Sequence, residues 1–319
     1  MVWRITAEQS LLSATTCPAR RIVLPGMVLA VSRRTTRRHM LWVPDPDGET
    51  EQAFWYCLAF AAREHGILVH AAVLMSNHIH LVITDVRAEA PLFYATLHRL
   101  LALCTKARLG WPEEVVNKSA TGAHELVSEP AIVKALGYAI ANPTTAGLVR
   151  RADEWPGART SARDMGTRTI VAKRPKHYLV EENWPAQIEL EITLPPALEG
   201  EIEPDEIRRR VQAHVRQAER DALTKSKQTG LRFLGARRAQ RVHHAERASS
   251  WETFGGRNPR FAAAGDAEAA RRTVERNRKF ESDYDEALAG WTSGARTVVF
   301  PPGTWWMRVH HNARVRPPP

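Results

Sequence analysis

Two histidines separated by one apolar residue stand in the stretch Met75–Ile83, MSNHIHLVI. The apolar residues around them predict a strand, and a strand turns alternate side chains to opposite faces. We therefore expect His78 and His80 to share one face while Ile79 points into a core. Two neutral imidazoles on a rigid strand can hold one divalent metal ion. An isolated pair of this kind is also typical of a solvated strand face, so both interpretations stay open at this point.

A tyrosine on a predicted helix is the next residue that could do chemistry. The helix begins at Ser128-Glu129-Pro130, because serine caps the first turn, glutamate suits the helix dipole and proline is tolerated there. Tyr138 lies on one stripe of this helix with Lys134 one turn earlier and Asn142 one turn later. Pro143 is expected to end the helix after Asn142. A lone tyrosine on a helix usually packs against the core of the protein. A phenol, an amide and a cation on one stripe of the helix favour a functional surface instead.

The elements that must position these residues alternate between strand and helix from residue 25 to residue 108. This order predicts an α+β fold with an antiparallel sheet and helices on one face. The strands are expected at Met27–Ser32, Ile67–Leu74 and His78–Thr84, and the helices at Glu49–His65 and Ala88–Arg108.

The later part of the chain has a different composition. Residues Trp155–Lys176 are rich in Pro, Gly and Arg, which predicts a boundary or a long loop. The alternating pattern of Gln187–Leu194 predicts a strand, and Glu206–Arg247 reads as a basic helical segment. The aromatic residues beyond it, from Trp251 to Trp306, would either stack on nucleic-acid bases or pack a small second core.

The positive charge points to a polyanionic partner. The 319 residues carry a net charge of +10, and the Arg208–Arg247 segment alone holds twelve Lys and Arg against three acidic residues. A second basic stretch, at the end of the first strand, is either a grip on a nucleic-acid backbone or a solvated loop. The candidate DNA-binding side chains are Arg33, Arg34, Arg37, Arg38, Lys134, Arg208, Arg209, Arg210, Arg237, Arg238 and Arg241.

Several classes of protein are disfavoured by simple counts. No stretch approaches the ~20 apolar residues of a membrane span, and the N-terminus lacks the pattern of a signal peptide. The three cysteines, Cys17, Cys57 and Cys104, lack CxxC spacing, which argues against a disulfide framework or a cysteine zinc site. We expect reduced thiols in a cytoplasmic protein that does not contact membranes.

Taken together, the motifs resemble those of the REP-associated tyrosine transposases, relatives of the single-tyrosine HUH transposases (HUH, His–hydrophobic–His). The resemblance covers about Pro25 to Gly157 and continues more weakly at Phe300–Arg308. The motifs in chain order are Pro25-Gly26, VSRRTTRR, MSNHIHLVI, YAIANPTTAGLV, Trp155-Pro156-Gly157 and FPPGTWWMR.

The resemblance implies a ferredoxin-like catalytic core that cleaves and rejoins single-stranded or hairpin, REP-like DNA. His78 and His80 would be ligands of Mg²⁺ or Mn²⁺, Asn142 would be the third ligand, and Tyr138 would be the nucleophile that forms a 5′-phosphotyrosine. Lys134 would lower the pKa of the tyrosine or hold a phosphate, or it is simply solvated. The implied division is an N-terminal arm over 1–24, a nuclease domain over 25–160 and a mainly helical, basic DNA-recognition extension over 161–319. Members of the wider group act as monomers or as homodimers.

Two other functions compete with this interpretation. A replication initiator or relaxase-like nicking enzyme would use the same chemistry, but the chain has no helicase P-loop of the form GxxxxGK[ST]. A non-catalytic hairpin-binding protein or repressor would retain the fold without the reaction. Only the joint presence of Tyr138, His78 and His80 speaks against it.

Overall fold

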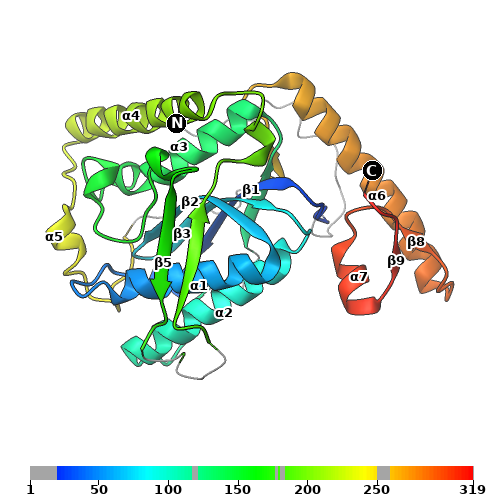
Figure 1. Ribbon diagram of the computed structural model, residues 1–319, viewed down its shortest axis with the longest axis horizontal. Helices are drawn as coiled ribbons and strands as arrows, with labels where there is room; N and C mark the ends of the chain where they lie inside the picture. The colour runs from blue at the N-terminus through cyan, green and yellow to red at the C-terminus, as the bar shows by residue number, and fades with distance from the viewer. Residues whose placement is uncertain (1–19, 117–120, 177–178, 180–183, 250–258, 319) are drawn as a thin grey trace.

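The computed structural model describes residues 20–116, 121–176, 179, 184–249 and 259–318. Most of the expected N-terminal arm, Cys17 and Trp251 lie outside these residues. The described chain folds into an α+β structure with a mixed seven-stranded sheet, a separate two-stranded sheet and seven α-helices (Figure 1).

The centre of the sheet is a strand–helix–strand–strand–helix–strand unit. Its four strands are adjacent in the order β2-β3-β1-β4, and each neighbouring pair is antiparallel. The predicted strands and helices of this region are confirmed, with bounds that move by one to two residues at most ends. The unit comprises β1 (Met27–Arg34), α1 (Glu49–His65), β2 (Ile67–Met75), β3 (His78–Asp85), α2 (Ala90–Leu109) and β4 (Gly122–Leu126).

The predicted antiparallel sheet is confirmed for these four strands, but the complete sheet is mixed. β6 (Gln187–Ile192) pairs with β2 in parallel at Val69 and Ile192, and β5 (Arg168–Lys173) pairs with β6. At the other edge, β7 (Phe261–Ala262) runs parallel to β4. On their own, the outer strands of the central unit, β2 and β4, would leave backbone N–H and C=O groups without hydrogen bonds. Later segments of the chain pair with these strands and form the missing hydrogen bonds.

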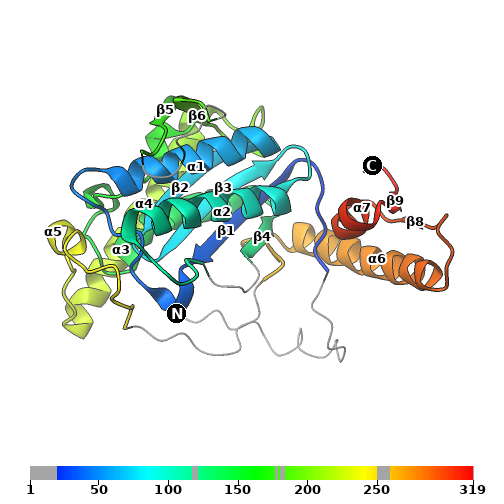
Figure 2. The ribbon, with the colours of Figure 1, turned by 90° about the horizontal axis from the view of Figure 1, so that it is seen from below.

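The helices cover both faces of the sheet, so the prediction of helices on one face is wrong. α1 and α2 pack on one face, while α3 (Glu129–Thr145) and α4 (Pro204–Thr229) lie on the opposite face (Figures 1 and 2). The physical reason is visible in β2, where eight of nine residues are buried and only Leu68 is partly exposed. A strand that is apolar on both faces needs a cover on each side.

α3 begins where the sequence predicts but ends later. The Ser128 hydroxyl accepts a hydrogen bond from the Ala131 amide at 3.4 Å, and Pro130 occupies the first turn. Pro143 lies inside the helix, which continues to Thr145. A proline near the last turn removes only one backbone hydrogen bond, and the Asn142 carbonyl still accepts from Ala146.

The close packing of α4 on α3 depends on Gly137. A Cβ atom at this position would lie 2.5 Å from the Cβ of His214 on α4. α4 buries Ile207, Val211 and Val215 against the rest of the fold, and the remainder of its surface is polar. α3 is therefore held between the sheet and α4, with the neighbour of Gly137, Tyr138, left on its exposed side.

The basic segment after α4 is not the continuous helix that its composition predicts. α4 ends at Gly230, whose φ is +69°, and beyond it lies only the short α5 (Ala236–Ala239). Residues 240–249 have no regular helix. Glycines at 230 and 235 break the pattern, because both adopt positive φ.

A small second core forms near the C-terminus, as one of the two interpretations of the aromatic residues requires. α6 (Ala267–Thr292), which the sequence pattern did not indicate, packs against β8 (Val299–Phe300), α7 (Trp305–His311) and β9 (Arg314–Val315). Phe300 and Met307 are buried there and Trp291 packs against them, whereas Trp306 is 59% exposed.

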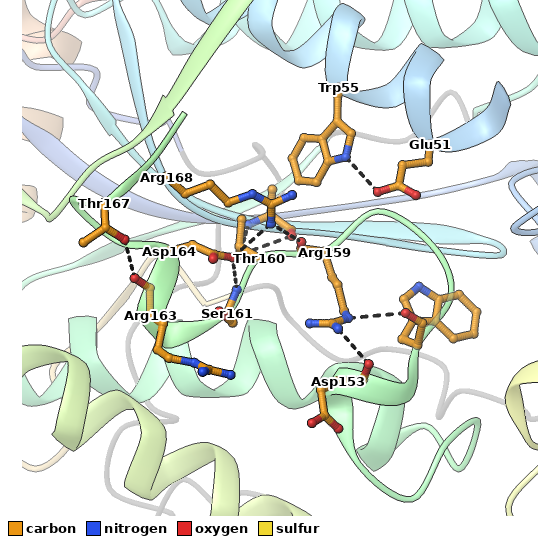
Figure 3. Close-up of polar contacts among 12 residues, drawn as sticks. Glu51, Trp55, Asp153, Arg159, Thr160, Ser161, Arg163, Asp164, Thr167 and Arg168 are labelled. Carbon is orange, nitrogen blue, oxygen red and sulfur yellow. Dashed lines mark hydrogen bonds and ion pairs between the residues drawn. The ribbon is translucent and has the colours of Figure 1, made fainter. Parts of the chain in front are cut away.

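The predicted loop over Trp155–Lys176 is an ordered connection. Trp155 donates its indole N–H to the Leu74 carbonyl at 2.9 Å. The Arg159 guanidinium donates to the Asp153 carbonyl, as Figure 3 shows. Thr160 bonds to the backbone of β2, and Asp164 pairs with Arg168 at the start of β5. These hydrogen bonds and the ion pair hold the segment that follows α3 against β2 and the start of β5.

Cys57 and Cys104 are buried free thiols, as predicted, with their sulfur atoms 3.9 Å apart. Among the described residues, no helix has the length and apolar character to cross a bilayer.

The Gly137 contact leads to a stability prediction. Replacing glycine by alanine stabilises an unconstrained helix by about 1 kcal/mol. Gly137→Ala should instead lower the free energy of unfolding by about 1–3 kcal/mol, because the added methyl group collides with backbone-proximal atoms of His214. Urea denaturation measures the difference, and a stabilised variant would contradict the packing.

Candidate active site

β3 presents the two histidines on the face that α3 covers. Ile79 between them is fully buried, and the two imidazole centroids lie 4.8 Å apart. Directly opposite on β1 are Ser32 and Arg34, which pair with His80 and His78. Residues that are paired across a ladder point to the same face. The floor of the candidate site is therefore two imidazoles bordered by one hydroxyl and one guanidinium.

Tyr138 lies above this floor. Its ring centroid is 5.7 Å from that of His80, with the two planes nearly perpendicular at 87°. The residue is 56% exposed. A phenol in this place is open to a large substrate from solvent while its ring contacts His80.

Asn142 completes the contact between helix and sheet. Its side chain is buried, and its Oδ1 lies 3.2 Å from the Nε2 of His78. The other ring nitrogen of His78, Nδ1, lies 2.7 Å from the Oδ1 of Asn77. An amide oxygen only accepts hydrogen bonds, so a neutral His78 ring can donate to only one of these two amides. When the proton is on Nδ1, the Nε2 lone pair faces the Oδ1 lone pairs of Asn142.

Two lone pairs that face each other at this distance are satisfied by a cation. Neighbouring ligand atoms about 2.1 Å from an octahedral ion are separated by roughly 3 Å, which the His78–Asn142 distance matches. Imidazole nitrogens suit transition metals, whereas an amide oxygen and water suit Mg²⁺ and Mn²⁺. The donor set thus fits Mn²⁺ well. Within the described part of the chain no group of three His, Cys, Asp or Glu side chains could hold a metal, so the third protein ligand here would be an amide.

The electrostatics of His80 also suit a ligand. Burial lowers the pKa of His80 to about 3, and repulsion from Arg34 and from His78 when that ring is protonated acts in the same direction. The ring is therefore neutral at physiological pH, which is the form that binds metal ions.

Lys134 is exposed on α3, one turn before Tyr138 on the same stripe of the helix. It thus lies where the sequence places it, on the solvent side of the candidate site.

The arginines near the first strand do not act as one group. Arg34 shares the histidine face, but Arg33 pairs with Ile79 and points to the opposite face, where burial lowers the pKa of its guanidinium. Arg37 and Arg38 lie in a short 3-10 turn, Thr36–Arg38, and both have positive φ. Arg37 pairs with Glu113 at 3.4 Å and keeps 59% of its side chain exposed.

The arginines of the C-terminal segment fall into two sets. Arg208, Arg209 and Arg210 at the start of α4 all form ion pairs with acidic side chains, including one from Arg210 to Glu129 of α3. By contrast, Arg237, Arg238 and Arg241 are exposed and make no ion pair with any residue that the structure describes. The second set offers its full charge to a partner, whereas the first set also holds α4 in place.

Two features of the site were missed in the sequence. One is Asn77, whose signal was its position directly before the histidine motif. The other is the docking of residues 245–248 onto the Thr36–Met40 turn, where the Met40 amide donates to the Glu246 carbonyl and the Ala248 amide donates to the Arg38 carbonyl. No local pattern could have indicated a contact between segments about 200 residues apart.

Comparison with known proteins gave matches only among solved structures. No protein-family model and no curated protein matches the chain. One similar structure is a REP-associated tyrosine transposase bound to a REP hairpin, with 16% identity, a TM-score of 0.39, and coverage of 46% of this chain and 84% of that one. Another, from Deinococcus radiodurans R1, carries a provisional transposase description, with 18% identity, a TM-score of 0.27, and coverage of 37% and 88%. The first neighbour belongs to the family that the sequence motifs resemble.

The lowered pKa of His80 predicts a specific pH dependence of stability. The unfolded chain binds a proton at this ring below about pH 6.5 and the folded chain does not, so folding loses stability as the pH falls. In metal-free protein, this ring should contribute a loss of about 1.4 kcal/mol per pH unit between pH 6 and 4. His80→Gln should show a correspondingly shallower slope in denaturation curves. Equal slopes would contradict a His80 ring that stays neutral in the folded protein over this pH range.

The two sets of arginines should differ in DNA binding. If each of Arg237, Arg238 and Arg241 contacts one phosphate, replacing the three together by alanine should reduce the slope of log K against log salt by about 2–3. Arg209→Ala should change the slope less, since Arg209 already pairs with Glu206. Fluorescence anisotropy across salt concentrations tests this, and the reverse ranking would overturn the assignment.

Proposed function

We propose that the protein is a metal-dependent transposase or endonuclease that cleaves and rejoins DNA through Tyr138. The observation that carries the proposal is the convergence of His78, His80, Asn142 and Tyr138 from one strand and one helix onto a single face. We also propose that the β1–β4 unit is a ferredoxin-like core of the HUH type. Its element order and its strand order β2-β3-β1-β4 support this.

The side chains divide the chemistry between them. His78, His80 and Asn142 would hold one Mg²⁺ or Mn²⁺, which when bound polarises the scissile phosphate and stabilises negative charge on its oxygens. The Tyr138 oxygen attacks the phosphorus in line and forms a 5′-phosphotyrosine, and its proton passes to solvent. The bond to the 3′ oxygen breaks and leaves a free 3′-OH. A 3′-OH then attacks the phosphotyrosine, restores the phosphodiester and releases Tyr138, so no nucleotide cofactor is consumed.

Exposure and charge support DNA as the substrate. Tyr138 is open to solvent, and Arg34 borders the histidines on the same face. Single-stranded or hairpin DNA is the substrate class that the sequence motifs imply. We propose that residues 25–160 carry the reaction and that residues 161–319 recognise the DNA, chiefly through Arg237, Arg238 and Arg241. Whether the protein works as a monomer or as a homodimer stays a prediction without a test.

The nucleophile can be tested with labelled hairpin DNA and Mn²⁺. Wild-type protein should form a covalent adduct that survives a denaturing gel, and Tyr138→Phe should form none because it lacks the attacking oxygen. Tyr94→Phe is a matched control, since Tyr94 lies on α2, which packs on the other face of the sheet. An adduct of equal yield in Tyr138→Phe, or none in wild type, would favour the non-catalytic DNA-binding alternative.

The metal ligands make a second test. His78→Ala and His80→Ala should each abolish cleavage, and EDTA should do the same to wild type. DNA affinity should stay within about tenfold, because the arginines that contact phosphate are unchanged. Circular dichroism checks folding. If both variants fail to fold, the histidines serve the core; if cleavage persists in either variant or in EDTA, the metal assignment is wrong.

A further inference from the structure

α7 carries a patch of aromatic and apolar side chains that the second core does not use. The buried side of the helix is Met307, which packs with Phe300. Trp306 is 59% exposed, Val309 is 42% exposed, and His310 is exposed as well. Residues three and four positions apart lie on the same side of a helix, so these three side chains are neighbours. An exposed patch of this kind is typical of an interaction surface.

Neighbouring rings hold the indole of Trp306 in place. The ring of His310 lies 3.9 Å from it between centroids, with the two planes tilted by 37°. His310 also contacts the ring of Trp305, with centroids 5.5 Å apart and planes at 75°. Trp306 nevertheless keeps more than half of its surface accessible to solvent. It therefore presents a flat aromatic surface that is already oriented, which lowers the entropy that a ligand must overcome on binding.

The segment that contains α7 has a one-sided charge. Residues 287–319 include four arginines and two histidines but no aspartate or glutamate. Arg308 donates to the Ala88 carbonyl, and Arg316 pairs with Asp283 of α6. Arg314, two residues after the end of α7, is exposed and forms no ion pair or side-chain hydrogen bond with any residue that the structure describes. Its charge is therefore available to an anionic partner.

Unpaired nucleotides match both the flat aromatic surface and the charge. A single strand presents the faces of its bases to an aromatic side chain and its phosphates to an arginine, whereas a duplex keeps those faces stacked inside. α7 also lies at the opposite end of the molecule from α5, which carries Arg237 and Arg238 (Figures 1 and 2). The two surfaces must therefore contact different parts of a bound DNA molecule.

We propose that α7 forms a binding site for single-stranded DNA, in which an unpaired base stacks on Trp306 and Arg314 attracts the backbone. The inference rests on the proposed function for the identity of the polymer as DNA, but it requires no cleavage. A protein with this site holds an unpaired stretch of its substrate at one end, while the arginines at α5 hold another part of the same DNA.

Binding of a fluorescent oligothymidylate to the full-length protein in EDTA tests the stacking contact. Trp306→Ala should bind about 10–100-fold more weakly, and Trp306→Phe should stay within about threefold of wild type because it keeps a ring. Val171→Ala, which removes a side chain of 52% exposure on β5, is the matched control and should bind as wild type does. Unchanged affinity in Trp306→Ala, or an equal loss of affinity for a duplex of the same length, would overturn the proposal.

The contribution of Arg314 is measured through the salt dependence of the same binding reaction. Arg314→Ala should reduce the slope of log K against log salt by about 0.7, the value for one phosphate contact on a single strand. Arg272→Ala on α6 is the control, since Arg272 already pairs with Glu268 and should change the slope less. A larger change in the control would remove Arg314 from the site.

Photocrosslinking locates the base directly. An oligonucleotide that carries 5-iododeoxyuridine should crosslink to the tryptic peptide of residues 297–308, which contains Trp306, and mass spectrometry identifies that peptide. Crosslinks confined to other peptides would contradict the proposed site.

Two further comparisons separate this inference from other occupants and from the proposed function. Suppose that Trp306→Ala abolishes binding to phosphatidylserine vesicles, or self-association in light scattering, without any change in oligonucleotide affinity. The patch then serves a membrane or a second copy, and the proposal is wrong. If wild type forms no covalent adduct but Trp306→Ala loses oligonucleotide affinity, the proposed function fails and the binding site stands. If the adduct forms and Trp306→Ala binds as wild type does, the binding site fails and the proposed function stands.

Discussion

The contact between the Nε2 of His78 and the Oδ1 of Asn142, 3.2 Å apart, is the interaction on which the rest of the site depends. It requires α3 to lie close to a strand face that carries polar side chains, which apolar packing alone does not favour. Packing elsewhere on α3 supplies the necessary stabilisation: Leu136 and Ile140 are buried, and Gly137 lets α4 approach from behind. With the His78 proton on Nδ1, a cation between Nε2 and the Asn142 Oδ1 would turn this contact into a binding site.

The same arrangement explains how charge and chemistry are separated in the fold. The candidate reacting groups lie on a surface with two imidazoles, an amide and a phenol, and the pKa of His80 is lowered by burial. The arginines differ in their surroundings, because some pair with acidic side chains and some are open to solvent. A net charge of +10 therefore does not act as one uniform field. Arg208–Arg210 help to anchor α4, while Arg237, Arg238 and Arg241 remain available to a polyanion.

The local parts of this structure follow from the sequence, and the long-range parts do not. Strand period and helix capping were sufficient to place His78 and His80 on one face and Tyr138 with Asn142 on one stripe. Three contacts join segments that are far apart in the chain. They are the pairing of β6 with β2, the cover of the second face by α3 and α4, and the docking of residues 245–248 on the Thr36–Met40 turn. No local pattern encodes such contacts. Counting charges has a related limit in reach, because it does not reveal which arginines are already paired with acidic side chains.

The central claim is that β3 and α3 together bind a divalent cation next to Tyr138. Crystals of the full-length protein soaked in Mn²⁺ and measured at a wavelength where manganese scatters anomalously test it most directly. We expect one anomalous peak within coordination distance, about 2.0–2.3 Å, of His78 Nε2, Asn142 Oδ1 and a ring nitrogen of His80. The absence of a peak at saturating Mn²⁺, with His78 Nε2 still in hydrogen-bond contact with Asn142, would contradict the claim.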